Sequence, residues 1–92
     1  MMPRLLIAND NFYLLEGYVE LLGGFFAVDS AINGVVALDM VQNKPKYFYD
    51  VIILDINMPI MGGIEASNKI HHFLEGENVL SFLNLSSLVS SK

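Results

Sequence analysis

The sequence predicts an α/β fold in which helices cover both faces of a parallel β-sheet. Short apolar runs alternate along the chain with longer segments whose apolar residues recur every three or four positions. The run at 51–54 is unbroken and rich in β-branched residues, which is typical of a strand buried on both faces. The resulting order, β-α-β-α-β-α-β, implies parallel strands joined by right-handed crossovers.

The first third of the chain is predicted to be a strand, a helix and a second strand. Residues 4–8 form the first strand, which ends at the polar triplet Asn9-Asp10-Asn11. Asn11 suits the N-cap of a helix whose apolar positions are 12, 15, 19 and 22. Two glycines, Gly23 and Gly24, are expected to end this helix. Residues 25–28 predict the second strand, and residues 29–32 lead away from it.

The dipeptide Asn33-Gly34 has two interpretations. It could form the turn of a hairpin between antiparallel strands. Ala37, Leu38 and Val41 follow at helical spacing, however, which favours a loop and then a helix over residues 35–42. A loop containing Pro45 then leads to the strand at 51–54.

The last third of the chain predicts one more helix and one more strand. After Gly63, a helix ending near Gly76 has Ala66, Ile70, Phe73 and Leu74 on one face. Residues 79–85 predict a fourth strand, and residues 87–92 form a serine-rich tail. We therefore expect one domain over residues 1–86, with an incomplete sheet of four strands and three helices.

Composition excludes several classes of protein. The hydrophobic fraction of 53% against 16% charged residues excludes a disordered chain, and the net charge of −5 disfavours direct binding to nucleic acid. There is no cysteine, so neither a disulfide nor a thiolate metal site can form. No apolar run approaches the roughly 20 residues of a membrane span, so a soluble, cytoplasmic protein is expected.

Residues 55–63, Asp-Ile-Asn-Met-Pro-Ile-Met-Gly-Gly, resemble the loop after the third strand of the response-regulator receiver domain. That family carries a phosphate-accepting Asp at the end of this strand, followed by Met-Pro and Gly at the spacing found here. The resemblance implies a flavodoxin-like sheet of order 2-1-3-4. Gly62 departs from the family, which usually has Asp at that position.

Acidic residues are expected to meet at the carboxyl edge of this sheet. Asp10 follows the first strand and Asp55 the third, and these strands are neighbours in the 2-1-3-4 order. Two converging carboxylates repel each other, and a divalent cation such as Mg²⁺ would remove that repulsion. The resemblance implies that Asp10, Asp55 and the main-chain carbonyl of Asn57 hold Mg²⁺. The family commonly has a second acid where Asn9 stands.

The remaining parts of a receiver site are only partly represented. The resemblance makes Ser86 the candidate for the family's hydroxyl at the end of the fourth strand, with Ser81 and Ser87 as alternatives. No residue matches the lysine at the end of the family's fifth strand, so the chain resembles a receiver truncated after its fourth strand. We expect this loss to weaken Mg²⁺ binding and phosphorylation at Asp55, and to leave an exposed edge that allows self-association.

The function expected from the resemblance is a phosphoacceptor in histidine-to-aspartate phosphorelay signalling. Its partner would be a histidine kinase or a histidine phosphotransfer domain. The alternative is a degenerate receiver that binds partners without being phosphorylated. An aspartate-nucleophile phosphohydrolase is disfavoured, because Asn57 stands where such an enzyme needs a second acid. At most, we expect self-catalysed phosphoryl transfer to Asp55.

Two further pairs of residues have simpler interpretations. His71 and His72 are adjacent on a helix and point in different directions, so we expect a solvated surface and not a metal pair. Met58 and Met61 are expected to pack in the core.

Overall fold

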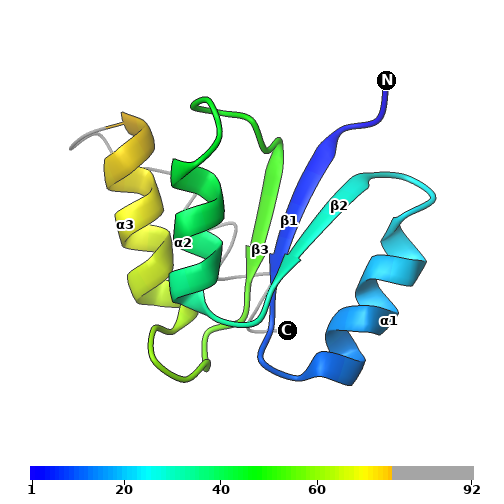
Figure 1. Ribbon diagram of the computed structural model, residues 1–92, viewed down its shortest axis with the longest axis horizontal. Coiled ribbons are helices and arrows are strands. Elements are labelled where there is room, and N and C mark those ends of the chain that lie inside the picture. Colours follow the sequence, from blue (N-terminus) through cyan, green and yellow to red (C-terminus); the bar gives the residue numbers. More distant parts are fainter. Residues whose placement is uncertain (76–92) are drawn as a thin grey trace.

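The computed structural model describes residues 1–75, in which three strands and three helices alternate (Figure 1). In chain order the elements are β1 (Arg4–Ala8), α1 (Phe12–Leu22), β2 (Ala27–Ala31), α2 (Gly34–Gln42), β3 (Val51–Leu54) and α3 (Gly63–Glu75). The fourth strand predicted at 79–85 and the tail predicted at 87–92 lie outside the described residues.

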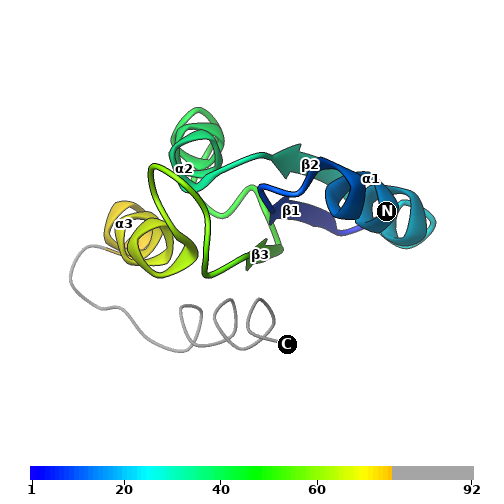
Figure 2. The same cartoon turned by 90° about the horizontal axis from the view of Figure 1, so that it is seen from below.

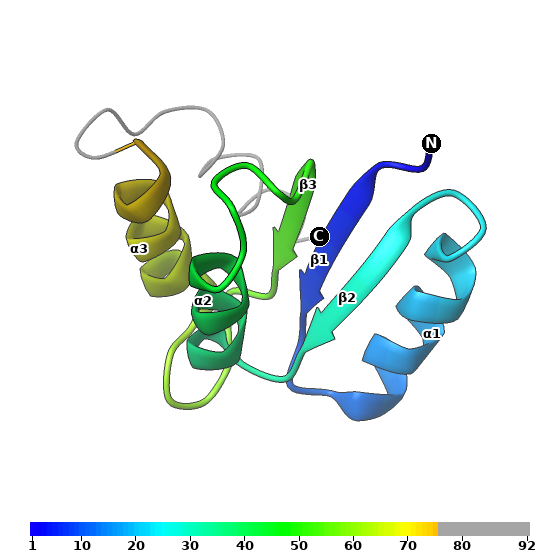
Figure 3. The same ribbon diagram turned by 45° about the horizontal axis from the view of Figure 1, so that its top comes forward.

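The described sheet has β1 at its centre, in the order β2-β1-β3, and both strand pairs are parallel. The register places Leu6 beside Asp29 of β2 and Ile52 of β3. Residues 5–8 are at most 3% exposed, because a strand flanked on both sides is covered by its neighbours and by helices. Figure 3 shows the three strands ending at one edge, where the chain turns into the helices. These findings confirm the predicted α/β fold and the 2-1-3 part of its strand order.

Helices lie on both faces of the sheet, as a doubly wound fold requires. Figures 1 and 2 show α2 and α3 side by side on one face and α1 on the other. The main core lies under α2 and α3. It is formed by apolar side chains from the strands, these two helices and the loops that join them: Leu6, Ala8, Ala31, Ala37, Val41, Tyr49, Ile52, Leu54, Met58, Met61, Ala66 and Ile70. The predicted packing of Met58 and Met61 is thereby confirmed.

Asparagine caps the first two helices. The side chain of Asn11 accepts the amide of Leu14 at 3.1 Å, as predicted, and Asn33 accepts the amide of Val36 at 2.9 Å. Each bond satisfies a backbone donor that has no partner within its helix. The cap at Asn33 also decides between the two interpretations of Asn33-Gly34, because the dipeptide begins α2 and does not form a hairpin.

The second strand was predicted two residues too early. It begins at Ala27, where pairing with Arg4 of β1 starts. Phe25 and Phe26 instead donate their amides to the carbonyl of Leu22, both at 2.9 Å, and so close the end of α1. Their apolar side chains resemble a strand in sequence, but their backbone donors belong to the helix terminus.

The prediction of a solvated histidine pair was wrong for His71. This side chain is 2% exposed, whereas His72 is exposed. The buried stripe of α3 runs through Ala66, Ser67 and Ile70 to His71, and is therefore wider than the apolar residues alone indicate. Adjacent helical residues do point in different directions, and in α3 this places one histidine inside and the other outside.

Candidate functional site

Asp55 is the first residue after β3 and continues the pairing of that strand with β1. Its amide donates to the carbonyl of Ala8 at 3.0 Å. The backbone of Asp55 is therefore held by the sheet, and its side chain is half-buried at the carboxyl edge. A carboxylate in this position is attached to backbone that is hydrogen-bonded to the central strand.

Asp10 follows β1 at the same edge. The preceding residue, Asn9, donates its amide to Ala31 at 3.0 Å, which extends the pairing of β1 with β2. The side chain of Asn9 then accepts the amide of Asn11 at 2.8 Å and turns the chain into α1. Asp10 is exposed in this turn. Because β1 and β3 are adjacent and parallel, Asp10 and Asp55 lie at one edge of the sheet.

Asn57 lies in the loop between β3 and α3. Its amide points to Oδ1 of Asp55 over a long distance of 3.4 Å, and the residue is exposed. Met58, which follows it, is buried in the core. Asn57 is thus held between the sheet-bonded Asp55 and the buried side chain of Met58.

Close backbone contacts fold the rest of this loop against its own beginning. Gly63 donates its amide to Ile56 at 3.0 Å. A Cβ atom at Gly63 would lie 2.3 Å from the carbonyl oxygen of Asp55, and one at Gly62 would lie 2.6 Å from that of Ile56. The loop conformation therefore requires glycine at both positions. This accounts for Gly62, the residue that departs from the receiver pattern.

The acids at the carboxyl edge have no cationic side chain beside them within residues 1–75. The ion pair in this part of the chain joins Lys69 and Glu65 at 3.2 Å on the surface of α3. The other basic residues of the described chain stand at the start of β1 or in the loop before β3: Arg4, Lys44 and Lys46. Within residues 1–75, no Lys or Arg side chain neutralises the negative charge of Asp10 and Asp55.

The donor atoms at this edge suit Mg²⁺. Two carboxylates and a main-chain carbonyl are hard oxygen ligands, and Mg²⁺ completes its octahedron with water. Within residues 1–75, no cluster of three or more His, Cys, Asp or Glu side chains could hold a metal ion. A site with two acids and one carbonyl is thus a small one that keeps several waters. The predicted hydroxyl residue, Ser86, lies outside the described residues.

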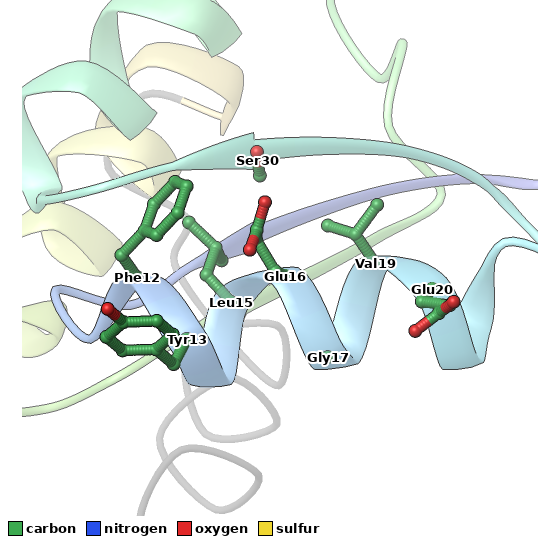
Figure 4. A pocket seen from close by; sticks show the side chains of 8 residues that line it. All are labelled: Phe12, Tyr13, Leu15, Glu16, Gly17, Val19, Glu20 and Ser30. Carbon is green, nitrogen blue, oxygen red and sulfur yellow. The ribbon is translucent and has the colours of Figure 1, made fainter.

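A hollow of about 680 Å³ lies along α1, on the side of the helix that faces β2 (Figure 4). Phe12, Leu15 and Glu16 point from the helix toward β2, where Ser30 stands (Figure 4). The full lining is Phe12, Tyr13, Leu15, Glu16, Gly17, Val19, Glu20 and Ser30. Leu15 is the buried residue of α1, so this helix covers its face of the sheet loosely.

Comparisons with known proteins agree with this architecture. The family model of the response regulator receiver domain matches residues 5–82. The chain is 33% identical over 81 residues to the chemotaxis protein CheY of Halobacterium salinarum, covering 87% of this chain and 65% of that protein. It is 36% identical over 78 residues to the hybrid signal transduction histidine kinase B of Dictyostelium discoideum, covering 84% of this chain and 4% of that one. The chain thus spans less than two thirds of either relative.

A solved structure shows the same fold. The response regulator TrrA of Thermotoga maritima, determined in complex with Mg²⁺ and BeF, superposes with a TM-score of 0.68 at 33% identity. The match covers 78% of this chain and 61% of that one. The fold is therefore the CheY-like, flavodoxin-type sheet. The chain belongs to the response regulator receiver family of two-component signalling.

No helix within residues 1–75 combines the length and the apolar character needed to cross a membrane.

Proposed function

We propose that this chain is a phosphoacceptor and that Asp55 receives the phosphoryl group. The observation that carries the proposal is that Asp55 and Asp10 follow two adjacent parallel strands, β3 and β1, and so stand at the same carboxyl edge. Ligands of open α/β sheets bind outside this edge. The half-buried carboxylate of Asp55 is the acid fixed directly by the sheet, which suits a nucleophile better than the exposed turn at Asp10.

The reaction is a displacement at phosphorus. An oxygen of the Asp55 carboxylate attacks the phosphorus atom of a phosphohistidine, so that a P–O bond forms and the P–N bond breaks. The electron pair of the broken bond stays on the imidazole nitrogen, which takes a proton from solvent. The work of the protein is to align the carboxylate and to limit the repulsion between it and the phosphoryl oxygens.

Asp10, Asp55 and the carbonyl of Asn57 are the residues that would hold Mg²⁺. When bound, the ion supplies the positive charge that offsets the phosphoryl oxygens. This contribution matters more here than in a site rich in cations, because no Lys or Arg side chain of residues 1–75 lies at this edge. We therefore expect phosphorylation to depend strictly on Mg²⁺ and to be slow.

The partner we propose is a histidine kinase or a histidine phosphotransfer domain. Support comes from the relative in Dictyostelium, which is itself a hybrid histidine kinase and contains a segment similar to this chain. Such a partner must present its phosphohistidine at the open carboxyl edge.

The test is intact-mass measurement after incubation with Mg²⁺ and a small phosphodonor such as acetyl phosphate. We expect partial addition of one phosphoryl group, and none without Mg²⁺ or in Asp55→Asn. Asp50→Asn is the matched control, because Asp50 is also an exposed acid next to β3 but lies at the opposite end of the strand. Addition that persists in Asp55→Asn would contradict the proposal.

One observation favours a second function. Within residues 1–75 no cationic side chain lies at this edge, and Asn9 stands where the family commonly has an acid. Both features favour a receiver that binds its partner but is not phosphorylated. Such a chain would bind its partner equally well with and without phosphodonor. Partner binding that is unchanged in Asp55→Asn, combined with no mass addition, would favour this alternative.

A further inference from the structure

The loop between β3 and α3 contains a disfavoured backbone conformation. Ile60 has a φ of 72°, and the amide of Met61 donates across it to the carbonyl of Pro59 at 2.7 Å. A three-residue turn with positive φ is rare and strained, and a β-branched side chain makes it worse. The Ile60 side chain is 81% exposed, so its packing does not offset the strain. Something else must hold the loop in this shape.

The N-terminus of α2 provides that support. Gly34 donates its amide to the carbonyl of Met61 at 3.0 Å. The donor itself is fixed, because the neighbouring Asn33 is 8% exposed and caps α2 through the amide of Val36. The Met61 side chain is buried in the core. The hydrogen bond therefore ties the loop between β3 and α3, through Met61, to the capped start of α2.

Only glycine fits at this contact. A Cβ atom at Gly34 would lie 2.4 Å from the Met61 oxygen, 2.9 Å from Met61 Cγ and 3.0 Å from Ala66 Cβ. The closest of these atoms is backbone and cannot rotate away. An alanine at residue 34 must push the loop and the helix apart.

We propose that Gly34 is a positioning residue for the loop between β3 and α3, which contains Asn57. Its hydrogen bond to Met61 keeps the loop in its observed conformation despite the strained backbone at Ile60. That conformation in turn sets the position of the Asn57 carbonyl relative to Asp55. A shift of Met61 would be passed on to Asn57, because both ends of the segment between them are held. Gly63 donates its amide to Ile56, and the side chain of Met58 is buried in the core. The expected effect of Gly34 on Mg²⁺ binding rests on the proposed function, whereas its expected effect on the conformation of the loop does not.

Amide hydrogen exchange of the metal-free protein tests the effect on the loop. In Gly34→Ala, the Gly63 amide should exchange at least about fivefold faster than in the wild type, while amides of β1 stay protected. Gly17→Ala is the matched control, because a Cβ atom there meets nothing within 4 Å. Equal Gly63 exchange in the two variants would overturn the proposal, whether or not Mg²⁺ binds.

A measurement on the unaltered chain keeps the proposal testable if Gly34→Ala fails to fold. Coupling between sites is reciprocal, so Mg²⁺ that needs the observed loop conformation must also protect it. Saturating Mg²⁺ should slow exchange of the Gly34 amide at least about fivefold and leave the Gly23 amide in α1 unchanged. Mg²⁺ that binds without slowing Gly34 would overturn the proposal. Absence of any Mg²⁺ binding would instead count against the proposed function and leave the metal-free test to decide.

Discussion

The hydroxyl of Tyr49, two residues before β3, forms a hydrogen bond with Asp29 of β2. It donates to Oδ2 of Asp29 at 2.6 Å, and the Tyr49 side chain is buried. Burial, together with the hydrogen bond and the negative charge of Asp29, raises the pKa of Tyr49 above its ordinary value. The bond therefore contributes to stability as long as the hydroxyl keeps its proton.

Replacing Tyr49 with phenylalanine should lower the free energy of unfolding by about 1–2 kcal/mol at neutral pH, because a hydrogen bond to a carboxylate is lost. The raised pKa belongs to the folded state, so the contribution of this group is full below about pH 10 and is lost as pH rises further. Urea unfolding from pH 7 to 11 should thus show a shallower decline above pH 10 in Tyr49→Phe than in the wild type. Parallel declines would contradict this account.

Ile60 is a β-branched residue with a positive φ of 72°, a backbone conformation that its side chain disfavours. Ile60→Gly should raise the free energy of unfolding by about 1 kcal/mol, because the relief of a strained φ exceeds the entropy cost of glycine. Thermal unfolding compared with Ile64→Gly checks this. Ile64 is also exposed but lies within α3, so glycine there should destabilise the protein. Destabilisation by Ile60→Gly would show that the turn is not strained.

At the scale of elements, the helices and strands depend on a few polar residues at their ends. Asn11 and Asn33 make the same capping bond, but Asn11 is exposed and Asn33 is buried. We expect Asn33→Ala to cost about 2 kcal/mol and Asn11→Ala about 1 kcal/mol. Chemical denaturation of the two variants checks this order, and a greater loss in Asn11→Ala would contradict it.

Element order was predictable because apolar periodicity is a local property of the sequence. The unbroken run at β3 and the helical spacing in α1, α2 and α3 were sufficient. The start of β2 was not predictable in this way, because Phe25 and Phe26 have strand-like side chains but use their amides to end α1. The burial of His71 was also missed, since nothing in the local pattern shows how wide the buried stripe of α3 is.

For the whole molecule, the strand order brings residues from distant parts of the chain to one edge. The shared edge of Asp10 and Asp55 followed from the strand order that the receiver resemblance implied, because Asp55 comes directly after β3 and Asp10 comes two residues after the end of β1. The contact of Gly34 with Met61 did not follow, since it depends on the conformations of two loops. In the sequence, the only sign of this contact was the dipeptide Asn33-Gly34. Such a dipeptide indicates a turn or the start of a helix, but it does not indicate which distant residue the glycine contacts.

The central claim is that Asp10 and Asp55 form one Mg²⁺ site at the carboxyl edge. The most direct measurement is a Mg²⁺ titration followed by backbone amide chemical shifts in the wild type, Asp10→Asn and Asp55→Asn. We predict saturable shifts centred on residues 9–11 and 55–57, at least about tenfold weaker binding in Asp10→Asn and none in Asp55→Asn. Shifts that are absent at millimolar Mg²⁺, or that persist unchanged in Asp55→Asn, would contradict the claim.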